Sequence, residues 1–340
     1  MKRIVFLCVL FCSILISEIC YCDFIGVGRG DGLTSMLWSF QKDKVNSSFL
    51  IADKAEVFCV EKIGINRFIV GGVTENRGTI WILENGKIVH SEYLPEANVV
   101  YAIKKAKDGL VWVVGSHKFM GACAWVGSET GSFKISSILN KGSIAYGLCE
   151  GKNGEIFVGG LFYTHGKVWI YRNGSWNLGD ILNDSRQINT LVADNEGTVY
   201  ACGQKINQGG EAVSSGHGAK HQGGVWIFNG EQWGPGIDVP SSIDIYCSVL
   251  DNNGKVWLGG SGHNNRTAWV LEKPLWKPVS LENCLALYSM NVDRKTGAIS
   301  TAGWNKSLRG RTWFKKEGKE WDKGYDLDKC FVIMGLVVGK

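Results

Sequence analysis

The sequence predicts an all-β fold made of one unit repeated around a ring, and three observations support this prediction. Tryptophans recur with a near-constant spacing of 43 or 44 residues, and one interval of 57 equals a repeat plus a 13-residue insertion; they are Trp38, Trp81, Trp125, Trp169, Trp226, Trp269 and Trp313. Each repeat holds short β-branched and aromatic runs bounded by Gly, Asn and Asp, which are strand signals. The two ends of the chain complement each other. Together they predict a single seven-bladed β-propeller with four antiparallel strands per blade.

The repeat at 245–281 shows the unit most clearly. Its strands are expected at 245–250, 255–260, 267–271 and 276–279, with a turn at Asp251-Asn252-Asn253-Gly254 between the first two. The third strand carries the recurring Trp. Its hairpin to the fourth strand often contains Asn-Gly, which accepts the positive φ of a tight turn; the pairs are Asn85-Gly86, Asn173-Gly174 and Asn229-Gly230.

Closure of the ring follows from the two termini. The first repeat, 24–51, lacks a first strand, and 330–334 reads as a first strand with no repeat after it. Pairing the two removes open sheet edges. The expected domain is 23–340, and its blades are 24–51 with 330–340, 54–95, 98–139, 143–182, 186–240, 243–283 and 285–328. Small residues on the first strands are expected to line the tight axis: Ala102, Gly147, Thr190, Cys247 and Ser289.

Two local patterns resemble known propeller repeats. Phe157-Val158-Gly159-Gly160, followed by Tyr171 and Trp176, resembles a kelch-type repeat. The segment from Asp251 to Trp257 resembles repeats of two-component-regulator and streptogramin-lyase-like propellers. These resemblances imply a propeller fold, and the last also implies that a histidine and metal site on one face can be catalytic.

Residues 1–22 are predicted to be a cleaved secretory signal peptide. Lys2 and Arg3 precede an apolar run at 4–16, and Cys20 and Cys22 are small residues at −3 and −1 of the cleavage site. A lipoprotein signal is the second interpretation. We therefore expect an exported chain, periplasmic, secreted or at the cell surface, with no membrane span.

Charge argues against a nucleic-acid partner, and the cysteine content raises the question of burial or disulfide bonding. The formal net charge is +5, falling to +4 without residues 1–22, and no basic tract suggests nucleic-acid binding. Seven Cys remain after the signal: Cys59, Cys123, Cys149, Cys202, Cys247, Cys284 and Cys330. They are expected to be small buried residues, with a disulfide framework as the alternative. A monomer is expected.

The connections divide between the two faces of the ring, because strand direction alternates. Turns one–two and three–four share one face, and the longer connections two–three and four–one share the other. Function usually lies on long loops of a rigid scaffold, so the second face is the candidate surface. Five of six histidines are expected in its two–three loops, as catalytic candidates: His117, His165, His217, His221 and His263. His217, His221 and His263 are also metal-ligand candidates; the alternative is that polar histidines fall in loops without forming a site.

Exposed aromatic and basic residues on the same face suggest ligand binding. The candidates are Phe119, Phe162, Tyr163, Trp304 and Arg309. A Gly-rich insertion at 204–224 is expected to be a lid, an anion-binding loop or an elaboration without fixed structure. The leading hypothesis is an exported binding module for a carbohydrate or protein partner, with no cofactor expected. A metal-assisted hydrolase or lyase, using a divalent metal, and a structural protein of the cell surface are the alternatives.

Overall fold

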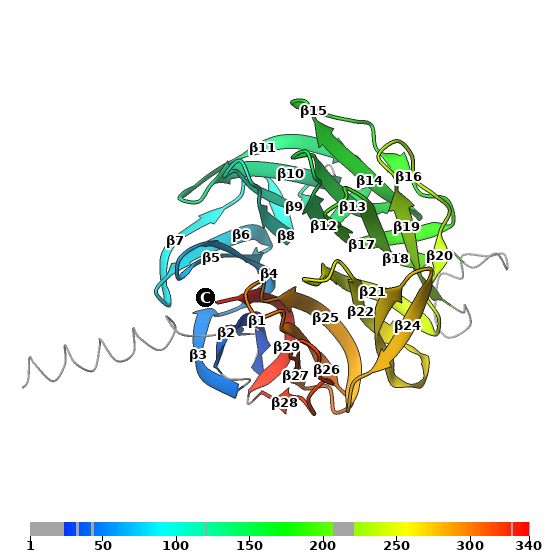
Figure 1. Cartoon of the computed structure of the whole chain (residues 1–340). Helices are drawn as coiled ribbons and strands as arrows, with labels where there is room; N and C mark the ends of the chain where they lie inside the picture. Colours follow the sequence, from blue (N-terminus) through cyan, green and yellow to red (C-terminus); the bar gives the residue numbers. More distant parts are fainter. Residues whose placement is uncertain are drawn as a thin grey trace, which may run out of the picture.

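The computed structural model describes residues 24–31, 34–41, 44–119, 121–206, 221–327 and 329–339. The predicted signal peptide and most of the Gly-rich insertion, including His217, lie outside them. Seven sheets are arranged around a central axis (Figure 1). The fold is the predicted seven-bladed β-propeller.

Each blade is listed from the axis outward. Blades 1 to 3 comprise β29 (Cys330–Val338), β1 (Phe24–Gly30), β2 (Ser35–Gln41), β3 (Lys44–Ala52); β4 (Ala55–Gly64), β5 (Arg67–Thr74), β6 (Arg77–Glu84), β7 (Lys87–Tyr93); and β8 (Ala97–Lys105), β9 (Val111–His117), β10 (Gly121–Ser128), β11 (Gly131–Asn140). Blades 4 and 5 comprise β12 (Ser143–Glu150), β13 (Ile156–Phe162), β14 (His165–Arg172), β15 (Ser175–Trp176), β16 (Asp180–Ile181); and β17 (Ser185–Ala193), β18 (Val199–Lys205), β19 (Gln222–Phe228), β20 (Ile237–Asp238). Blades 6 and 7 comprise β21 (Ser242–Leu250), β22 (Val256–Gly262), β23 (Arg266–Glu272), β24 (Leu275–Ser280); and β25 (Cys284–Val292), β26 (Ile299–Asn305), β27 (Gly310–Lys315), β28 (Tyr325–Asp326). A short 3-10 helix, η2 (His263–Asn265), joins β22 to β23.

The last strand closes the ring. β29 pairs antiparallel with β1, with Phe24 opposite Val338 and Gly26 opposite Leu336. The C-terminal strand is therefore the inner strand of blade 1, as the complementary ends predict.

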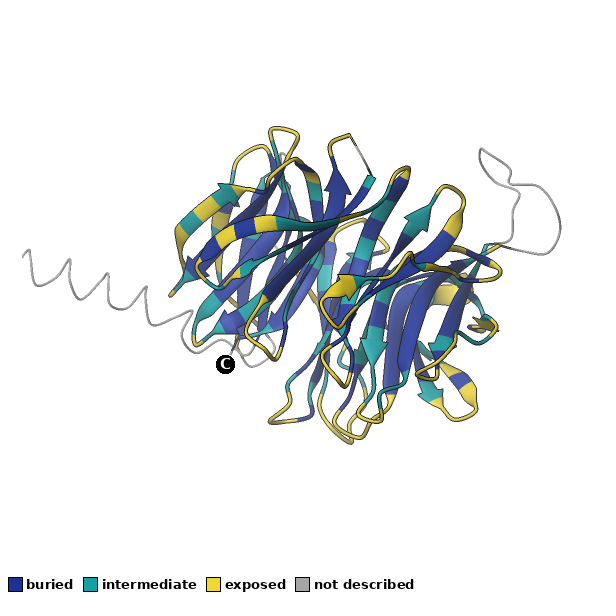
Figure 2. Ribbon diagram, turned by 90° about the horizontal axis from the view of Figure 1, so that it is seen from above, coloured by how far each residue is buried: buried dark blue, intermediate teal, exposed yellow. Residues whose placement is uncertain are grey.

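Apolar layers between successive blades form the core. Strands are buried along most of their length, whereas exposure concentrates in the hairpins and outer strands (Figure 2). One such layer joins Phe157 of blade 4 to Ile188 and Trp226 of blade 5. Every sheet thus buries both faces, which explains the nearly continuous apolar strands.

The recurring tryptophans join neighbouring blades. All seven lie on third strands and are at most 4% exposed. The indole N–H of Trp226 donates to the carbonyl of Asn183 at 2.8 Å, in the connection that enters its blade. Trp125, Trp269 and Trp313 make the same bond to Pro95, Pro240 and Glu282, and Trp169 reaches the side-chain oxygen of Asn140. In five of the seven repeats the 43–44-residue period therefore reflects a repeated hydrogen bond as well as a packed ring.

Three fourth strands are shorter than the repeat predicts. In blades 4, 5 and 7 the outer strand is reduced to two-residue pieces. In blade 7 the carboxylate of Asp322 accepts hydrogen bonds from the backbone N–H of Phe314 and of Gly324, and in blade 4 Asn177 does the same for Ile170 and Gly179. A side chain replaces part of the strand pairing there.

The seven cysteines within the described residues are free thiols. Six are buried and Cys59 is half-buried. Burial raises the pKa of the Cys149 thiol to about 12 and that of Cys123 to about 12. They are small core residues, so within the described residues the alternative of a disulfide framework is not realised.

Among the described residues, no helix is long and apolar enough to cross a membrane.

Candidate functional site

A β-bulge recurs at the equivalent position of every inner strand. In each case one residue is displaced from the pairing with the second strand, and the displaced residues, here called the inner ring, are Phe58, Tyr101, Tyr146, Asn189, Tyr246, Tyr288 and Met334. Bulges re-aim side chains and are frequent beside functional sites. The inner ring therefore presents five aromatic side chains next to the axis.

A glycine on each second strand makes the bulge possible. A Cβ at these positions would lie 2.0 or 2.1 Å from the carbonyl oxygen two residues before the bulged residue, so no other residue fits without movement; the glycines are Gly28, Gly72, Gly115, Gly160, Gly203, Gly260 and Gly303. The repeated Gly at the end of the second strand is thus a requirement of the inner ring.

The small residues that follow the bulge have a different role from the one expected. They were predicted to line the axis, but they face the next inner strand. A Cβ on Gly147 would lie 2.6 Å from the carbonyl of Asn189. The thiol of Cys247 is 3.9 Å from the carbonyl of Leu287, and the hydroxyl of Thr190 is 2.9 Å from that of Ser248. Large bulged residues, not small ones, occupy the axis.

The aromatic rings contact one another from blade to blade. Ring centroids are 5.5 Å apart for Phe58 and Tyr101, 5.3 Å for Tyr101 and Tyr146, and 5.1 Å for Tyr246 and Tyr288. Trp304 continues the series at 5.4 Å from Tyr288. Phe331 follows at 5.6 Å from Trp304, and Arg29 lies over its ring at 5.3 Å. All of these side chains are half-buried.

A buried polar cluster fills the gap between Tyr146 and Tyr246. Asp244 is only 5% exposed. Its carboxylate accepts hydrogen bonds from Asn189 at 2.9 Å and from Gln187 at 3.2 Å. Burial raises the pKa of Asp244 to about 7, and these bonds, with the backbone N–H of Ile245 and the charge of Arg186, offset it only in part.

Positive and negative charges are balanced around the inner ring. Arg29 lies 3.6 Å from Glu56, and Arg186 is the nearby cation that acts on Asp244. Burial raises the pKa of Tyr146 to about 12, with smaller effects of Tyr101 and Asp244, and it also raises the pKa of Tyr101, Tyr246 and Tyr288.

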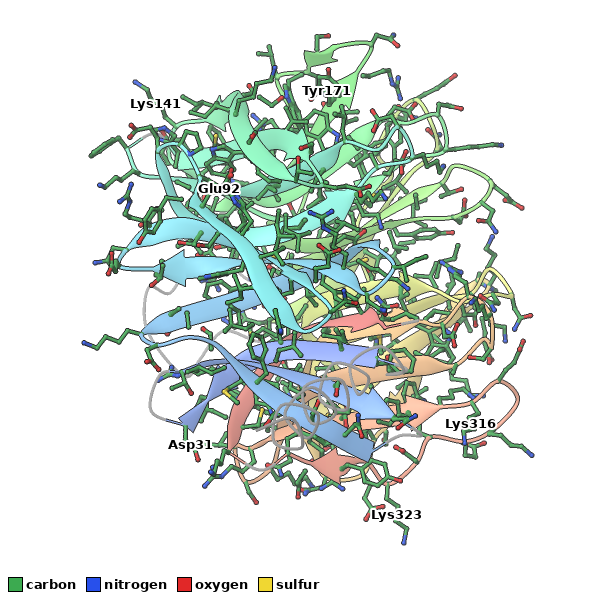
Figure 3. The ribbon with its side chains drawn as sticks, turned by 90° about the vertical axis from the view of Figure 1, so that its left-hand side faces the viewer. Asp31, Glu92, Lys141, Tyr171, Lys316 and Lys323 are labelled. Carbon is green, nitrogen blue, oxygen red and sulfur yellow. The ribbon has the colours of Figure 1, made fainter. Side chains whose placement is uncertain are left out.

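The bulged residues are the fourth or fifth residues of their inner strands, and their neighbours lie toward the face predicted to carry function. Glu56 and Asp244 are in the first three residues of their inner strands, and Trp304 is next to last in β26. These positions belong to the face of the two–three and four–one connections, here called the loop face; the opposite one is the turn face. Figure 3 shows Asp31 and Lys141 of the loop face on one side of the molecule and Lys316 of the turn face on the other.

The sequence-predicted histidines do not form a described cluster. His117 is the buried last residue of β9, and its Nδ1 accepts the N–H of Phe119 at 3.2 Å. His165 is the exposed first residue of β14, and His263 is exposed in η2. Both ring nitrogens of His221 lie 3.4 Å from Arg186 Nη1; partial burial, then the charge of Arg186, lowers the pKa of His221. Within the described residues, no group of three or more His, Cys, Asp or Glu side chains is placed to hold a metal.

The predicted ligand-binding residues occupy two places. Trp304 extends the aromatic series of the inner ring, between Tyr288 and Phe331. Phe119 and Tyr163 are 78% and 67% exposed on the rim, and Phe162 packs on Tyr163 with Lys167 over its ring at 4.6 Å. Arg309 pairs with Asp31 at 3.2 Å on the exposed surface.

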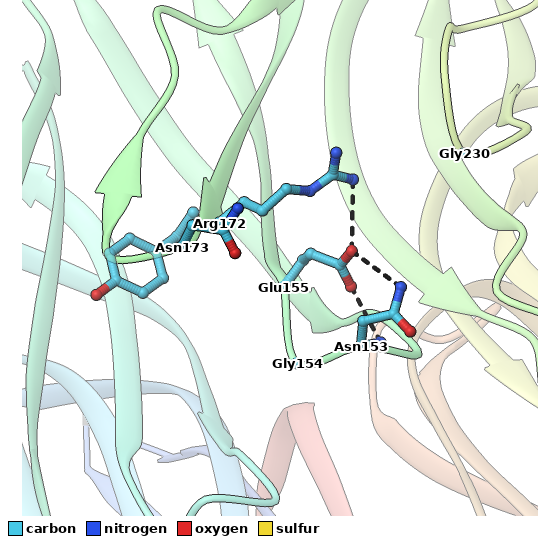
Figure 4. A pocket seen from close by; sticks show the side chains of 7 residues that line it. Asn153, Gly154, Glu155, Arg172, Asn173 and Gly230 are labelled. Carbon is cyan, nitrogen blue, oxygen red and sulfur yellow. Dashed lines mark hydrogen bonds and ion pairs between the residues drawn. The ribbon is translucent and has the colours of Figure 1, made fainter.

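Several cavities open on the turn face instead. One lies between blades 4 and 5, where Glu155 accepts hydrogen bonds from Asn153 and pairs with Arg172 at 3.4 Å (Figure 4). The carboxylate is thus engaged by its own turn and by β14. The charged groups that line this cavity therefore bind one another.

Comparisons with known proteins find the fold and no family. The sequence matches no family model and no curated protein. A catalytically inactive virginiamycin B lyase from Staphylococcus aureus, solved with quinupristin, is similar with a TM-score of 0.61 at 13% identity, over 82% of this chain and 87% of that one. A lectin from Burkholderia pseudomallei reaches 0.63 at 9% identity, over 90% and 99%. The WD40 propeller domain of Doa1 reaches 0.61 at 16% identity, over 88% and 91%. The chain is a β-propeller.

Proposed function

We propose that this chain is a binding module that takes a glycan at the loop-face mouth of its central channel. The observation that carries the proposal is the inner ring, which sets four tyrosines and a phenylalanine along the axis, beside Asn189, Gln187 and Asp244. A lectin among the similar folds agrees with this proposal but does not carry it.

The chemistry of the mouth suits a neutral ligand rich in hydroxyl groups. Aromatic rings offer apolar surface to the C–H faces of a sugar, while phenol, amide and carboxylate groups exchange hydrogen bonds with its hydroxyls. Glu56 and Asp244 each have an arginine nearby, so the mouth offers no strong field of one sign. A neutral glycan fits this balance better than a strongly charged ligand does.

Binding to a glycan array, followed by calorimetric titration of the best glycan, tests this proposal. Replacing Tyr146→Ala or Tyr288→Ala should weaken binding at least about tenfold, because each removes a mouth ring worth roughly 1–3 kcal/mol. Tyr93→Ala is the matched control, since Tyr93 lies on the outer strand β7 and is 41% exposed. Equal losses in all three variants, or no glycan bound at all, would refute the proposal.

A protein partner is the second candidate, favoured by the exposed rings of Phe119 and Tyr163 on neighbouring blades. Exposed aromatic residues of this kind often anchor protein interfaces. The double variant Phe119→Ser and Tyr163→Ser should abolish capture of a partner while leaving glycan binding unchanged. A glycan affinity that falls as well would place both rings in the glycan site.

We also propose that the chain is exported, on the basis of the predicted signal at 1–22. N-terminal sequencing of the mature protein should begin at Asp23. A start at Met1, or a lipid on Cys20 or Cys22, would overturn this assignment.

A further inference from the structure

We propose that the opposite, turn-face mouth of the channel is a second binding site, and that it takes a multiply charged anion such as a phosphate or sulfate ester. A cavity of about 600 Å³ lies where several inner strands end. Its lining includes Glu61 of β4, Lys104 of β8, Glu150 of β12 and Leu250 of β21, so it surrounds the axis.

Basic residues outnumber acidic ones in the lining of this cavity. Six are basic and three are acidic: Lys62, Lys104, Lys105, Lys107, Lys152 and Arg294 against Glu61, Glu150 and Asp194. They come from blades 2, 3, 4, 5 and 7, although these blades are far apart in sequence. The mouth therefore carries a positive field that no single turn creates.

The three acidic groups are already engaged by protein donors. Glu61 accepts from Lys104 Nζ at 2.9 Å and from the N–H of Lys105 at 3.3 Å. Both oxygens of Glu150 accept the N–H of Lys107 at 3.1 Å. Asp194 accepts two amides of its own turn and the hydroxyl of Tyr200. These donors hold the three carboxylates in place, and the lining keeps an excess of three basic residues over acidic ones.

Three basic side chains remain for a ligand. Lys104 is paired with Glu61, Lys105 is paired with Glu129, and Lys62 has an interaction of its own. The exposed side chains of Lys107 and Lys152, in contrast, form no ion pair with another described residue, and Arg294 makes a single long bond of 3.3 Å to the carbonyl of Asp251. Two ammonium groups and a guanidinium around one opening match an anion with several oxygens, because charge-assisted hydrogen bonds to such groups are the strong ones.

The two mouths therefore differ in chemistry. The loop-face mouth is aromatic with balanced charge, whereas the turn-face mouth is polar and basic. A single extended ligand is not required, and the anion site does not depend on the glycan proposal.

Calorimetric titration of the full chain at about 50 mM salt tests the anion site. Inorganic pyrophosphate and a persulfated disaccharide are the two probes, and they separate phosphate from sulfate recognition. At least one should bind, and its affinity should fall at least tenfold at about 200 mM salt because the contact is ionic.

Matched variants locate the site. Lys107→Gln with Lys152→Gln should weaken binding at least tenfold, and Arg294→Gln should weaken it severalfold. Lys87→Gln with Lys323→Gln removes the same charge at exposed positions elsewhere and should change affinity less than twofold. Figure 3 shows Lys323 on the outside of blade 7. Absence of binding by both probes, or equal losses in the two double variants, would overturn the proposal.

Discussion

At the scale of the single residue, Asp244 is the group whose environment departs most from that of a surface carboxylate. It is buried at the mouth of the channel, and its hydrogen-bond donors are neutral amides from the neighbouring blade. Burial raises its pKa to about 7. Asp244 therefore changes charge near neutral pH, in the middle of the proposed glycan site.

The raised pKa predicts how stability depends on pH. The folded state holds the Asp244 proton up to about pH 7, whereas the unfolded state releases it near 3.8, so the folded state binds more protons in between. This contribution to stability is complete below the unfolded value and is lost as pH rises through 7. Between pH 5 and 8, wild type should lose stability on the order of a few kcal/mol relative to Asp244→Asn. Urea denaturation at both pH values measures the difference, and parallel losses in the two proteins would show that Asp244 is not the titrating group.

At the scale of the element, the bulge and its glycine act as one unit. The second-strand glycine leaves room for a carbonyl oxygen of the inner strand. The residue two positions after that carbonyl is the bulged residue, which turns toward the axis. The glycines are visible in the sequence as repeated positions. Their purpose is not, because the close approach is made to a neighbouring strand, which for Gly28 lies at the other end of the chain.

Adding one methyl group at such a glycine should disturb its blade. In Gly203→Ala the new Cβ would lie 2.1 Å from the carbonyl oxygen of Gln187. The free energy of unfolding should fall by roughly 1–3 kcal/mol, since the bulge must shift. Chemical denaturation measures the effect.

Gly64→Ala provides the control, because its Cβ would meet nothing nearer than Arg67 Cβ at 3.5 Å. Its free energy of unfolding should change by less than about 0.5 kcal/mol. A Gly203→Ala protein as stable as this control would mean that the bulge does not need the glycine.

Element by element, the sequence predicted the strands well and the site poorly. Tryptophan spacing and turn residues located the third strands and hairpins, because both are local signals. The inner ring was missed even though Tyr101, Tyr146, Tyr246 and Tyr288 immediately precede the small residues that were singled out. If side chains alternated strictly along each inner strand, these tyrosines would face a neighbouring blade. The bulge interrupts the alternation and turns them toward the channel. Asp244 was missed because its partners, Gln187 and Asn189, are more than 50 residues away.

At the scale of the whole molecule, closure of the ring makes blade 1 from both ends of the chain. β29 pairs with β1 and also packs against the first strand of blade 2, where a Cβ on Gly335 would lie 3.0 Å from the N–H of Val60. Blade 1 without β29 exposes the edge of β1 and the apolar side chains of Ile25 and Val27. An unpaired edge of this kind favours association between chains.

Removal of residues 330–340 should therefore affect the entire fold. The truncated chain should melt at a much lower temperature than the full chain, or form soluble aggregates. Thermal denaturation and size-exclusion chromatography measure the two outcomes. A truncated protein that stays monomeric with an unchanged melting temperature would contradict closure by the C-terminal strand.

The central claim is that the inner ring forms a glycan-binding mouth, and an NMR titration with selectively labelled tyrosine tests it most directly. On addition of the glycan selected from the array, the ring signals of Tyr101, Tyr146, Tyr246 and Tyr288 should shift together. Those of Tyr93, Tyr171 and Tyr325, which lie on outer parts of the blades, should stay in place. Shifts confined to the outer tyrosines, with the four mouth signals unmoved at saturation, would contradict the claim.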